Sequence, residues 1–373
     1  MRILMLISAA IVGFGCAANP GVDGGTGGGS AEGGGSATGG GVGGGGSTGG
    51  GAATGGGSST GGGGATGGGG ATGGGGASDA GLPPGEYTRT LTAFPNRSFD
   101  LIIPATDGGL PPAVFQLHGG GGNRNAARRT SCPNGVTTSP QCFDAMATAR
   151  GFIVIIPDGT GAVLRTWNSG GGSNGWQCVS GPACSSMVDE QAYFTAVLAD
   201  VASLVPIDLN RVYATGLSNG GSMSERLACQ FTEVRGIAGV GSGNQWSTTN
   251  ACTRAVNVIE IHGTADPCWN WDGGPASCAD MNPGSKISVP DTIALWSRNN
   301  GCDGGETLVP IPDTMNDGTT TVRHVYSCGT AALELYEVID GGHTWPSGAG
   351  SGNGATATDW VANEVILDFF ESH

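Results

Sequence analysis

Ser218 stands in a turn whose residue types suit nucleophilic catalysis. It lies in the sequence Gly-Leu-Ser-Asn-Gly at 216–220, after a strand-like run that opens at Arg211 and before a helical run from Met223 to Phe231. A strand, a sharp turn with serine at its tip and a helix is the context of a Gly-x-Ser-x-Gly nucleophile elbow, which lifts the hydroxyl clear of the sheet. We predict that Ser218 is a nucleophile; the alternative is an ordinary strand-to-helix turn.

The same five-residue pattern occurs elsewhere in the chain through composition alone. It surrounds Ser47, Ser59 and Ser173, but none of these serines follows a strand-like run or opens a helical one. In the turn at 216–220, glycine is needed at both ends, because a Cβ there would collide with a neighbouring strand or helix. The surroundings therefore select Ser218.

A serine hydroxyl is a poor nucleophile at neutral pH and needs a base, normally a histidine oriented by a carboxylate. The chain has five histidines. His118 and His262 each end a strand just before glycine, where hydrogen bonds to nearby loops are expected. His324 lies within a strand and His373 is the last residue. His343 follows the last predicted strand in a glycine-rich loop, so we predict it as the base, with a surface-loop histidine as the alternative.

Asp266 is the predicted carboxylate, because it follows a buried strand by a few residues. Sites in open α/β folds collect at this carboxyl edge of the sheet. Asp158 also follows a strand but precedes the serine, and Asp340 is too close to His343 in sequence to orient it. A turn or helix-cap role is the alternative for Asp266.

Two N–H donors are needed to stabilise the oxyanion of an acyl-transfer reaction. The amide of Asn219, directly after the nucleophile, is one candidate. The sequence His-Gly-Gly-Gly-Gly at 118–122 follows a strand, and we favour Gly120 as the second donor. A glycine loop can also hold a phosphate, but no Gly-Lys-Ser or Gly-Lys-Thr follows here.

Composition limits the partners of the chain. It has 373 residues and a formal net charge of -15, which argues against nucleic acid or an anionic membrane as a partner. No run of about 18 apolar residues is present, so a spanning helix is not expected. Residues 83–373 are ample for one large α/β domain.

The first part of the chain is not typical of a folded domain. Residues 1–16 carry one positive charge, a short apolar run and small residues, which indicates an export signal. Cleavage before Cys16 would allow a lipid to be attached there, so a cell-surface lipoprotein and a secreted protein are both open. Residues 17–82 consist largely of Gly with Ser, Thr and Ala, which predicts a disordered linker.

The cysteines indicate disulfides. Eleven are present, and setting Cys16 aside leaves an even number, as expected of an exported chain. Their order suggests sequential local pairs, five at most. A metal site is the alternative, but no Cys-x-x-Cys or histidine cluster accompanies them.

Hydrophobic runs predict strands that alternate with helical segments, which favours a mostly parallel sheet covered on both faces. The expected strands are 87–92, 98–103, 113–117, 152–156, 236–240, 256–261, 320–326 and 333–339, besides the one before Ser218. Helices are expected to end near Arg150 and to span 188–205, 289–300 and 358–370. Residues 160–186 are expected to be irregular.

Taken in order, seven short motifs resemble one known family. They are Leu-His-Gly-Gly-Gly at 117–121, Pro-Asp-Gly-Thr at 157–160, Thr-Trp-Asn-Ser-Gly at 166–170, Val-Asp at 188–189, Gly-Leu-Ser-Asn-Gly-Gly at 216–221, His-Gly-Thr-Ala-Asp-Pro at 262–267 and Gly-Gly-His-Thr-Trp-Pro at 341–346. The set resembles the secreted esterases that include polyhydroxybutyrate depolymerases and feruloyl and acetylxylan esterases. The resemblance covers nearly all of residues 97–373.

This resemblance implies an α/β-hydrolase fold, a Ser218–Asp266–His343 triad and no cofactor. The runs around Ser218 and His343 are more similar to the feruloyl and acetylxylan branch, which implies a polysaccharide-linked or polymeric ester as substrate. A polyester depolymerase is the alternative, and a tethered carbohydrate-binding protein without catalysis is a third reading. Trp167, Trp176 and Trp345 are candidates for stacking on a sugar or phenolic ring, and simple core packing is the alternative for each.

Overall fold

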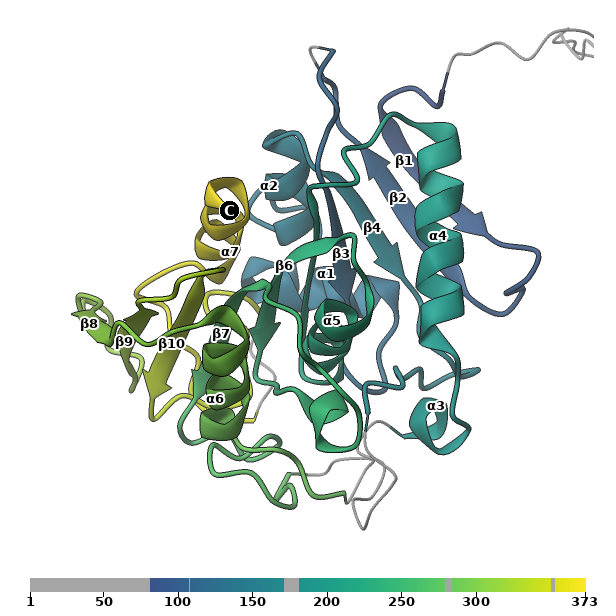
Figure 1. The fold of residues 1–373 in the computed structure, drawn as a ribbon. Coiled ribbons are helices and arrows are strands. Elements are labelled where there is room, and N and C mark those ends of the chain that lie inside the picture. The colour runs from purple at the N-terminus through teal and green to yellow at the C-terminus, as the bar shows by residue number, and fades with distance from the viewer. Residues whose placement is uncertain (1–80, 107, 171–180, 279–283, 350–352) are drawn as a thin grey trace, which may run out of the picture. The chain divides into compact units, whose positions relative to one another are not determined.

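The computed structural model describes residues 81–106, 108–170, 181–278, 284–349 and 353–373 (Figure 1). The predicted export signal, Cys16 and nearly all of the predicted linker lie outside these residues. So do Trp176 and Cys178. The domain boundaries predicted at 16 and 82 therefore stay predictions.

A sheet of ten strands forms the centre of the described part of the chain, in the order β1-β2-β4-β3-β5-β6-β7-β10-β9-β8. The strands are β1 (Gly85–Thr90), β2 (Ser98–Ile103), β3 (Ala113–Leu117), β4 (Ile153–Pro157), β5 (Val212–Leu217), β6 (Val234–Val240), β7 (Asn257–Gly263), β8 (Glu306–Pro310), β9 (Thr320–Tyr326) and β10 (Leu333–Ile339).

The middle of this sheet is parallel and its margins are antiparallel. Neighbouring strands from β4 through β3, β5, β6 and β7 to β10 all pair in parallel. At one margin β1 and β2 pair antiparallel, and at the other β9 and β8 do the same. The carboxyl ends of six parallel strands consequently meet at one edge.

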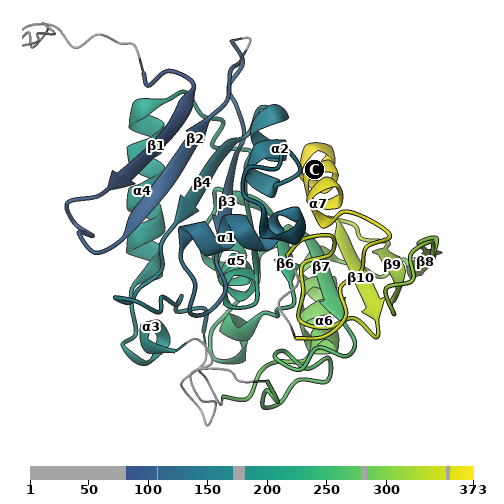
Figure 2. The ribbon, with the colours of Figure 1, turned by 180° about the vertical axis from the view of Figure 1, so that it is seen from behind.

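Helices cover both faces of the sheet, as the alternating pattern predicts. Helices α4, α5 and α6 lie on one face (Figure 1), and α1, α2 and α7 lie on the other (Figure 2). The helices are α1 (Arg124–Ser131), α2 (Phe143–Ala149), α3 (Pro182–Ser185), α4 (Glu190–Leu204), α5 (Asn219–Gln230), α6 (Val289–Asn300) and α7 (Ala362–Ser372). Among the described residues, no helix combines the length and the apolar character needed to cross a membrane.

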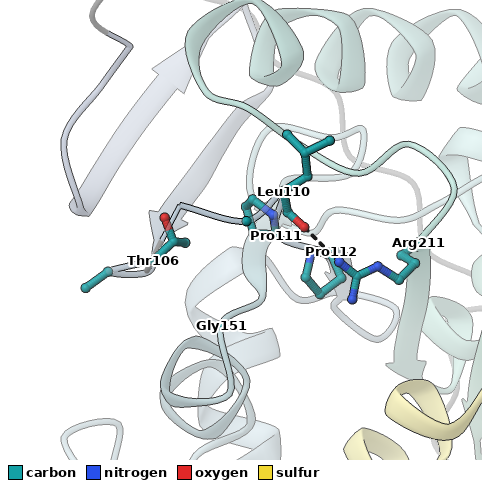
Figure 3. A pocket seen from close by; sticks show the side chains of 8 residues that line it. Thr106, Leu110, Pro111, Pro112, Gly151 and Arg211 are labelled. Carbon is teal, nitrogen blue, oxygen red and sulfur yellow. Dashed lines mark hydrogen bonds between the residues drawn. The ribbon is translucent and has the colours of Figure 1, made fainter.

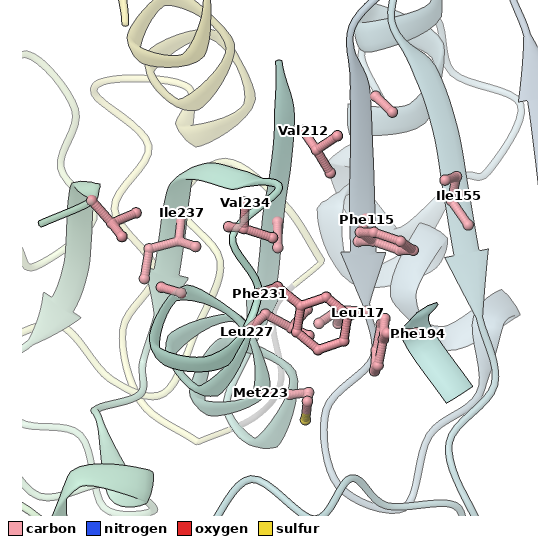
Figure 4. Close-up of a cluster of buried hydrophobic side chains, with 14 of the residues drawn as sticks. Phe115, Leu117, Ile155, Phe194, Val212, Met223, Leu227, Phe231, Val234 and Ile237 are labelled. Atoms are coloured by element: carbon pink, nitrogen blue, oxygen red, sulfur yellow. The ribbon is translucent and has the colours of Figure 1, made fainter. Parts of the chain in front are cut away.

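Separate apolar clusters fill the two layers between sheet and helices. In the first, Phe115 and Leu117 of β3 contact side chains of α4 and α5 such as Phe194 and Leu227 (Figure 4). In the second, residues such as Phe370 of α7 lie against the opposite face. Strands β3 and β4 are buried at every position, which explains why they read as continuous apolar runs rather than alternating ones.

Several elements differ from the sequence prediction. Helix α5 begins at Asn219, directly after the serine, rather than at Met223. Helix α1 was not predicted because it is rich in polar residues; it is capped by Asn123, whose side chain accepts the Ala126 N–H. Strand β8 was not predicted either, since all of its residues are exposed and no buried face gives it a pattern. The short helix α3 interrupts the segment expected to be irregular.

Four disulfides join cysteines that are neighbours in the order of the sequence, which confirms the expected local pairing for the described residues. They are Cys132–Cys142, Cys229–Cys252, Cys268–Cys278 and Cys302–Cys328. Cys178 lies outside the described residues, so the fifth predicted pair stays a prediction.

Candidate active site

The backbone of Ser218 has the strained conformation of a nucleophile elbow. It lies between β5 and α5 with φ 59° and ψ −123°, a region that non-glycine residues rarely adopt. The Ser218 N–H donates to the carbonyl of Val240, the last residue of β6, at 2.8 Å. The turn is therefore held against the carboxyl end of the adjacent strand.

A side chain at either of the two glycines that flank Ser218 would clash with β3, in agreement with the predicted need for glycine there. A Cβ at Gly216 would lie 2.5 Å from the carbonyl oxygen of Leu117, and one at Gly220 would lie 2.4 Å from the same atom. Real Cβ atoms do not approach backbone so closely, and β3 cannot move away without losing its pairing with β5. Glycine lets β5, the turn and α5 approach β3 closely.

Asp266 and His343 form a buried pair. Asp266 Oδ2 lies 2.7 Å from His343 Nδ1, and the two residues are 3% and 5% exposed. An ionised carboxylate can only accept, so Nδ1 carries the proton and the lone pair is left on Nε2. This is the tautomer that a histidine needs to act as a base toward a serine hydroxyl.

The carboxylate of Asp266 is further fixed by its own loop. Its Oδ1 accepts the backbone N–H groups of Cys268 at 2.7 Å and Trp269 at 2.8 Å. Burial by itself would raise the pKa of Asp266, but the hydrogen bond from His343, the nearby imidazoles and these amides bring the pKa below its ordinary value. Asp266 is consequently ionised at neutral pH.

The turn after β6 brings Ser218 and the Asp266–His343 pair to one place. Val240 accepts the Ser218 amide. The next residue, Gly241, has φ +53°, and a Cβ there would lie 3.1 Å from His343 Nδ1 and 3.3 Å from Asp266 Oδ2. Ser218 and the Asp266–His343 pair therefore both lie beside the turn at Val240 and Gly241, at the carboxyl ends of β5, β7 and β10.

The glycine loop after β3 lies against the elbow. A Cβ on Gly119 would be 3.6 Å from Ser218 Cβ, and one on Gly120 would be 3.7 Å from Asn219 Cβ. Gly120 is therefore beside the first turn of α5, whose N–H groups point away from the helix body. This placement supports the predicted oxyanion role of the Gly120 and Asn219 amides, which stays a proposal.

His118 anchors that loop and does not act as a base. Its Nε2 accepts the Gly159 N–H at 2.9 Å, so its Nδ1 carries the proton and donates to the Gly119 carbonyl at 2.8 Å. Burial lowers the pKa of His118 to about 4, which keeps the ring neutral. The expectation that His118 bonds to nearby loops is confirmed.

The side chain of Asn219 also organises the site. Its oxygen accepts the Trp167 N–H at 2.7 Å, and its amide donates to the Trp167 carbonyl and to Ser169 Oγ. It therefore ties the segment around Trp167 to the start of α5. No pattern in the sequence indicates this second role.

The burial of Trp167 and Trp345 does not support their predicted stacking role. Trp167 is 0% exposed and donates its indole N–H to the His118 carbonyl, while Trp345 is 2% exposed and donates to Asn363 Oδ1. Neither ring has a face open to a sugar or a phenolic group. Contrary to the prediction, both are core residues. Trp176 lies outside the described residues.

Asp158 and His324, which were considered besides Asp266 and His343, contact other groups. Asp158 accepts from the backbone and the guanidinium of Arg124, so it supports a charge network and not His343. His324 lies between Glu306 and Glu337 on the margin of the sheet, 2.5 Å and 2.9 Å from their carboxylates, in agreement with a structural role.

Sequence reasoning missed a buried acidic pair behind the site. Glu225 of α5 and Glu260 of β7 are both 0% exposed, and His262, on the same strand as Glu260, is 1% exposed. One signal was present: Glu260 is a single carboxylate within the apolar run from Val258 to Ile261.

Potential metal ligands gather at two places in the described part of the chain, and each includes a disulfide-bonded cysteine. The groups are Cys132, Cys142 and Asp144, and Asp266, Cys268 and His343. Sulfur in a disulfide is not available as a thiolate ligand. Asp144 is then the remaining donor of the first group, and the predicted acid Asp266 and base His343 remain in the second.

A cavity of about 340 Å³ lies away from the serine. Its lining includes Pro112 before β3 and Arg211 before β5, where Arg211 donates to the Leu110 carbonyl at 2.7 Å (Figure 3). Pro112 and Arg211 lie at the amino ends of their strands, whereas Ser218 lies at the carboxyl end of β5. The cavity therefore opens at the edge of the sheet opposite to Ser218.

The strand order, the strained serine and the acid–histidine pair at the carboxyl edge together define an α/β-hydrolase. The chain is related in sequence to esterases, feruloyl esterases among them. It is 28% identical over 260 residues to a protein of Nocardia uniformis subsp. tsuyamanensis named as an esterase (NocK), covering 66% of this chain and 68% of the relative. It is also 28% identical over 248 residues to feruloyl esterase C of Emericella nidulans, covering 66% and 75%.

No protein-family model matches the chain. Among solved structures, an acetyl xylan esterase from Aspergillus awamori aligns with a TM-score of 0.46 at 16% identity, covering 74% of this chain and 95% of that one.

Proposed function

We propose that this chain is an exported serine carboxylic ester hydrolase that removes feruloyl or acetyl groups from plant cell-wall polysaccharide. The observation that carries the proposal is the buried Asp266–His343 pair, set against the turn that also holds the Ser218 amide. The relatedness to feruloyl esterases supports the same substrate class. No step of this reaction needs a cofactor.

The proposed reaction proceeds in two halves through an acyl-enzyme. His343 Nε2 takes the proton of Ser218 Oγ as the oxygen attacks the ester carbonyl, and Asp266 stabilises the imidazolium that forms. The N–H groups of Asn219 and Gly120 bind the oxyanion, each lowering the barrier by about 3–4 kcal/mol. The imidazolium then protonates the leaving sugar hydroxyl. Water, deprotonated by His343, attacks the acyl carbon, and the imidazolium returns the proton to Ser218 Oγ as the bond to the acid breaks.

The Ser218→Ala variant tests the proposed nucleophile. Hydrolysis of an aryl acetate should fall by on the order of 10⁶-fold in kcat, as for other serine hydrolases that lose the nucleophile. A fluorophosphonate probe should label the wild-type protein and leave the variant unlabelled. A variant that keeps its activity would contradict the assignment, and an unlabelled wild type would favour a binding protein without catalysis.

A panel of substrates tests the proposed specificity. Release of ferulate and acetate from feruloylated and acetylated xylan should exceed release of hydroxybutyrate from polyhydroxybutyrate particles. The polyester depolymerase alternative predicts the opposite order. The same Ser218→Ala protein serves as the blank for each substrate.

Export is part of the proposal. The four described disulfides require an oxidising compartment, which agrees with the predicted signal at 1–16. Whether a lipid is attached at Cys16 is tested by labelling cells with a fatty acid analogue. A lipoprotein would carry the label and lose it in Cys16→Ser, whereas a secreted protein would be unlabelled and found in the medium.

A further inference from the structure

Trp167 joins the two segments that carry the proposed oxyanion donors. Its indole N–H donates to the carbonyl of His118 at 2.9 Å, in the glycine loop that follows β3. Its backbone N–H donates to the side-chain oxygen of Asn219 at 2.7 Å, and its backbone carbonyl accepts the Asn219 amide at 3.1 Å. Trp167 is 49 positions from His118 and 52 from Asn219 in the sequence. One buried residue therefore connects the loop of Gly120 with the start of α5.

An oxyanion hole works only if both donors reach the same oxygen atom. Each N–H donor must lie about 2.7–3.1 Å from that oxygen, so the two donor nitrogens can be at most about 6 Å apart. The parallel pairing of β3 with β5 aligns the two strands as far as Leu117 and Gly216. Gly120 and Asn219 lie beyond these paired residues. Contacts other than the strand register must therefore set the distance between their amides.

The ring of Trp167 has little freedom to move. Its centroid lies 4.8 Å from that of the His118 ring and 5.5 Å from that of Phe194 on α4. The guanidinium carbon of Arg97 lies 5.3 Å from the same ring. Close-packed interiors are barely compressible and transmit displacements. A shift of the Trp167 ring would consequently move the His118 carbonyl and the glycine loop behind it.

The residue after Trp167 is fixed by side chains of α4 and α5. The Asn168 N–H donates to Glu190 Oε1 at 3.0 Å, and the Asn168 carbonyl accepts from Arg226 Nη1. Glu190 is fully buried, and its other carboxylate oxygen lies 2.8 Å from Arg97 Nη2 in an ion pair. The segment that contains Trp167 is therefore anchored to two helices as well as to the loop that it contacts.

We propose that Trp167 is a positioning residue, which sets the spacing between the N–H groups of Gly120 and Asn219 so that both bind the oxyanion. It acts through the His118 carbonyl at one end and through the Asn219 side chain at the other. The inference rests on the proposed function. Binding of the substrate in its ground state does not require this spacing, but both tetrahedral intermediates do. Trp167 is then a spacer of the oxyanion hole and makes no contact with the substrate.

Two matched substitutions separate this role from a contribution to stability alone. Trp167→Phe keeps an aromatic ring in the core and removes the N–H that donates to His118. Trp360→Phe is the control, because Trp360 is also buried and its indole N–H donates to Thr321 Oγ1 on β9, likewise at 2.9 Å. Each substitution removes one buried indole hydrogen bond, and only the first of these bonds reaches the loop of Gly120.

Kinetics with an aryl acetate give the first measurement. In Trp167→Phe, kcat should fall by about ten- to a hundredfold, whereas removal of a donor outright costs about 10²–10³-fold. KM should stay within about twofold, because acylation and deacylation both pass through an oxyanion at the same place and slow together. Trp360→Phe should lower Tm by a similar amount and keep the kcat and KM of the wild type. Equal kcat values in the two variants would overturn the proposal.

Binding of phenylboronic acid gives a second measurement, without turnover. The boron forms a bond to Ser218 Oγ, the hydroxyl proton passes to His343, and an oxygen of the tetrahedral boronate occupies the place of the oxyanion. The dissociation constant should rise in Trp167→Phe by about the factor by which kcat falls, and stay unchanged in Trp360→Phe. The downfield proton resonance of His343 Nδ1–H, bonded to Asp266, should be the same in the free wild type and both variants. A weaker boronate complex with a shifted resonance would assign the loss to the acid–base pair and overturn the proposal.

Asn219→Ala tests the other end of the spacer and does not depend on the folding of Trp167→Phe. It keeps the backbone N–H of residue 219 and removes the side-chain bonds to Trp167, so kcat should fall, boronate binding should weaken and KM should stay the same. A change at either end disconnects the same spacer, so kcat of the double variant should lie near that of the less active single variant. Effects that multiply, or wild-type kcat and boronate affinity in Asn219→Ala, would overturn the proposal.

The possible outcomes distinguish this inference from the proposed function. If the wild type hydrolyses esters and Trp167→Phe behaves like Trp360→Phe, this inference fails alone. If no ester is hydrolysed, but phenylboronic acid binds the wild type and loses affinity in Trp167→Phe, the proposed function fails alone.

Discussion

Asp266 Oδ2 lies 2.7 Å from Nδ1 of His343, although the two residues are 77 positions apart in the sequence. The parallel pairing of β7 with β10 brings their loops together, and no contact within either loop would do so. The position of the base therefore depends on the register of two strands. This relationship makes the role of each partner testable.

Replacement of Asp266 by asparagine should lower kcat by about 10³–10⁴-fold and leave the fold intact, because the amide no longer stabilises the required tautomer and imidazolium of His343. The matched comparison is Asp158→Asn, which should lower Tm through the loss of its ion pair with Arg124 and leave kcat within a few fold. Kinetics with an aryl acetate and thermal unfolding separate the two effects. A kcat loss in Asp158→Asn equal to that of Asp266→Asn would point to the rival acid.

The Gly220→Ala variant should be unstable. Its methyl group would lie 2.4 Å from the Leu117 carbonyl oxygen and 2.7 Å from that of His118, and overpacking of this kind costs about 1–3 kcal/mol or more. Gly109→Ala is the control, since no atom lies within 4 Å of its added Cβ. Urea titration should show a lower midpoint for the first variant only. Equal midpoints would mean that the contact at the elbow is looser than the structure indicates.

Trp345→Phe should cost stability and leave substrate affinity unchanged. The substitution removes the indole N–H that donates to Asn363 Oδ1 and leaves a buried acceptor without its donor, at a cost of about 1–3 kcal/mol. The free energy of unfolding should fall while KM for feruloylated xylan fragments stays within twofold. A large rise in KM at unchanged stability would restore the predicted stacking role.

The Cys268–Cys278 disulfide should matter for activity more than the Cys302–Cys328 disulfide. Cys268 donates its amide to Asp266 Oδ1, so its bridge restrains the loop that carries the acid. Replacing each pair by serines should lower stability by about 2–4 kcal/mol, but kcat at a temperature where both variants are folded should fall mainly for the first. Equal kcat values would show that the acid loop holds its shape without the bridge.

Stability should depend on pH in opposite directions for the two kinds of buried acid. The pKa of Glu260 is raised from 4.5 to about 8, so its contribution is complete below the unfolded pKa and is lost as pH rises toward 8. The pKa of Asp266 is lowered from 3.8, so its contribution is present above that value and lost on further acidification. Chemical denaturation across pH 3–9 should show a weaker alkaline decline in Glu260→Gln. An unchanged decline would assign the effect to other groups.

The catalytic candidates could be predicted because each lies just after a strand, and strand ends can be read from apolar runs. Ser218, Asp266 and His343 follow this rule, and parallel strands place such ends at one edge. The burial of Trp167 could not be predicted, since it depends on contacts with His118 and Asn219 from distant segments. Nor could the placement of the buried Glu260 carboxyl, because the space for it comes from Gly239 on the neighbouring strand β6.

Each of the four described disulfides closes a short stretch of chain, with the bonded cysteines 10 to 26 positions apart in the sequence. A polypeptide that enters an oxidising compartment from its amino end can complete every one of these bridges before the cysteines of the next have arrived. Oxidation in the order of synthesis then yields the native set directly, and maturation of this chain should require little help from enzymes that reshuffle mismatched thiols.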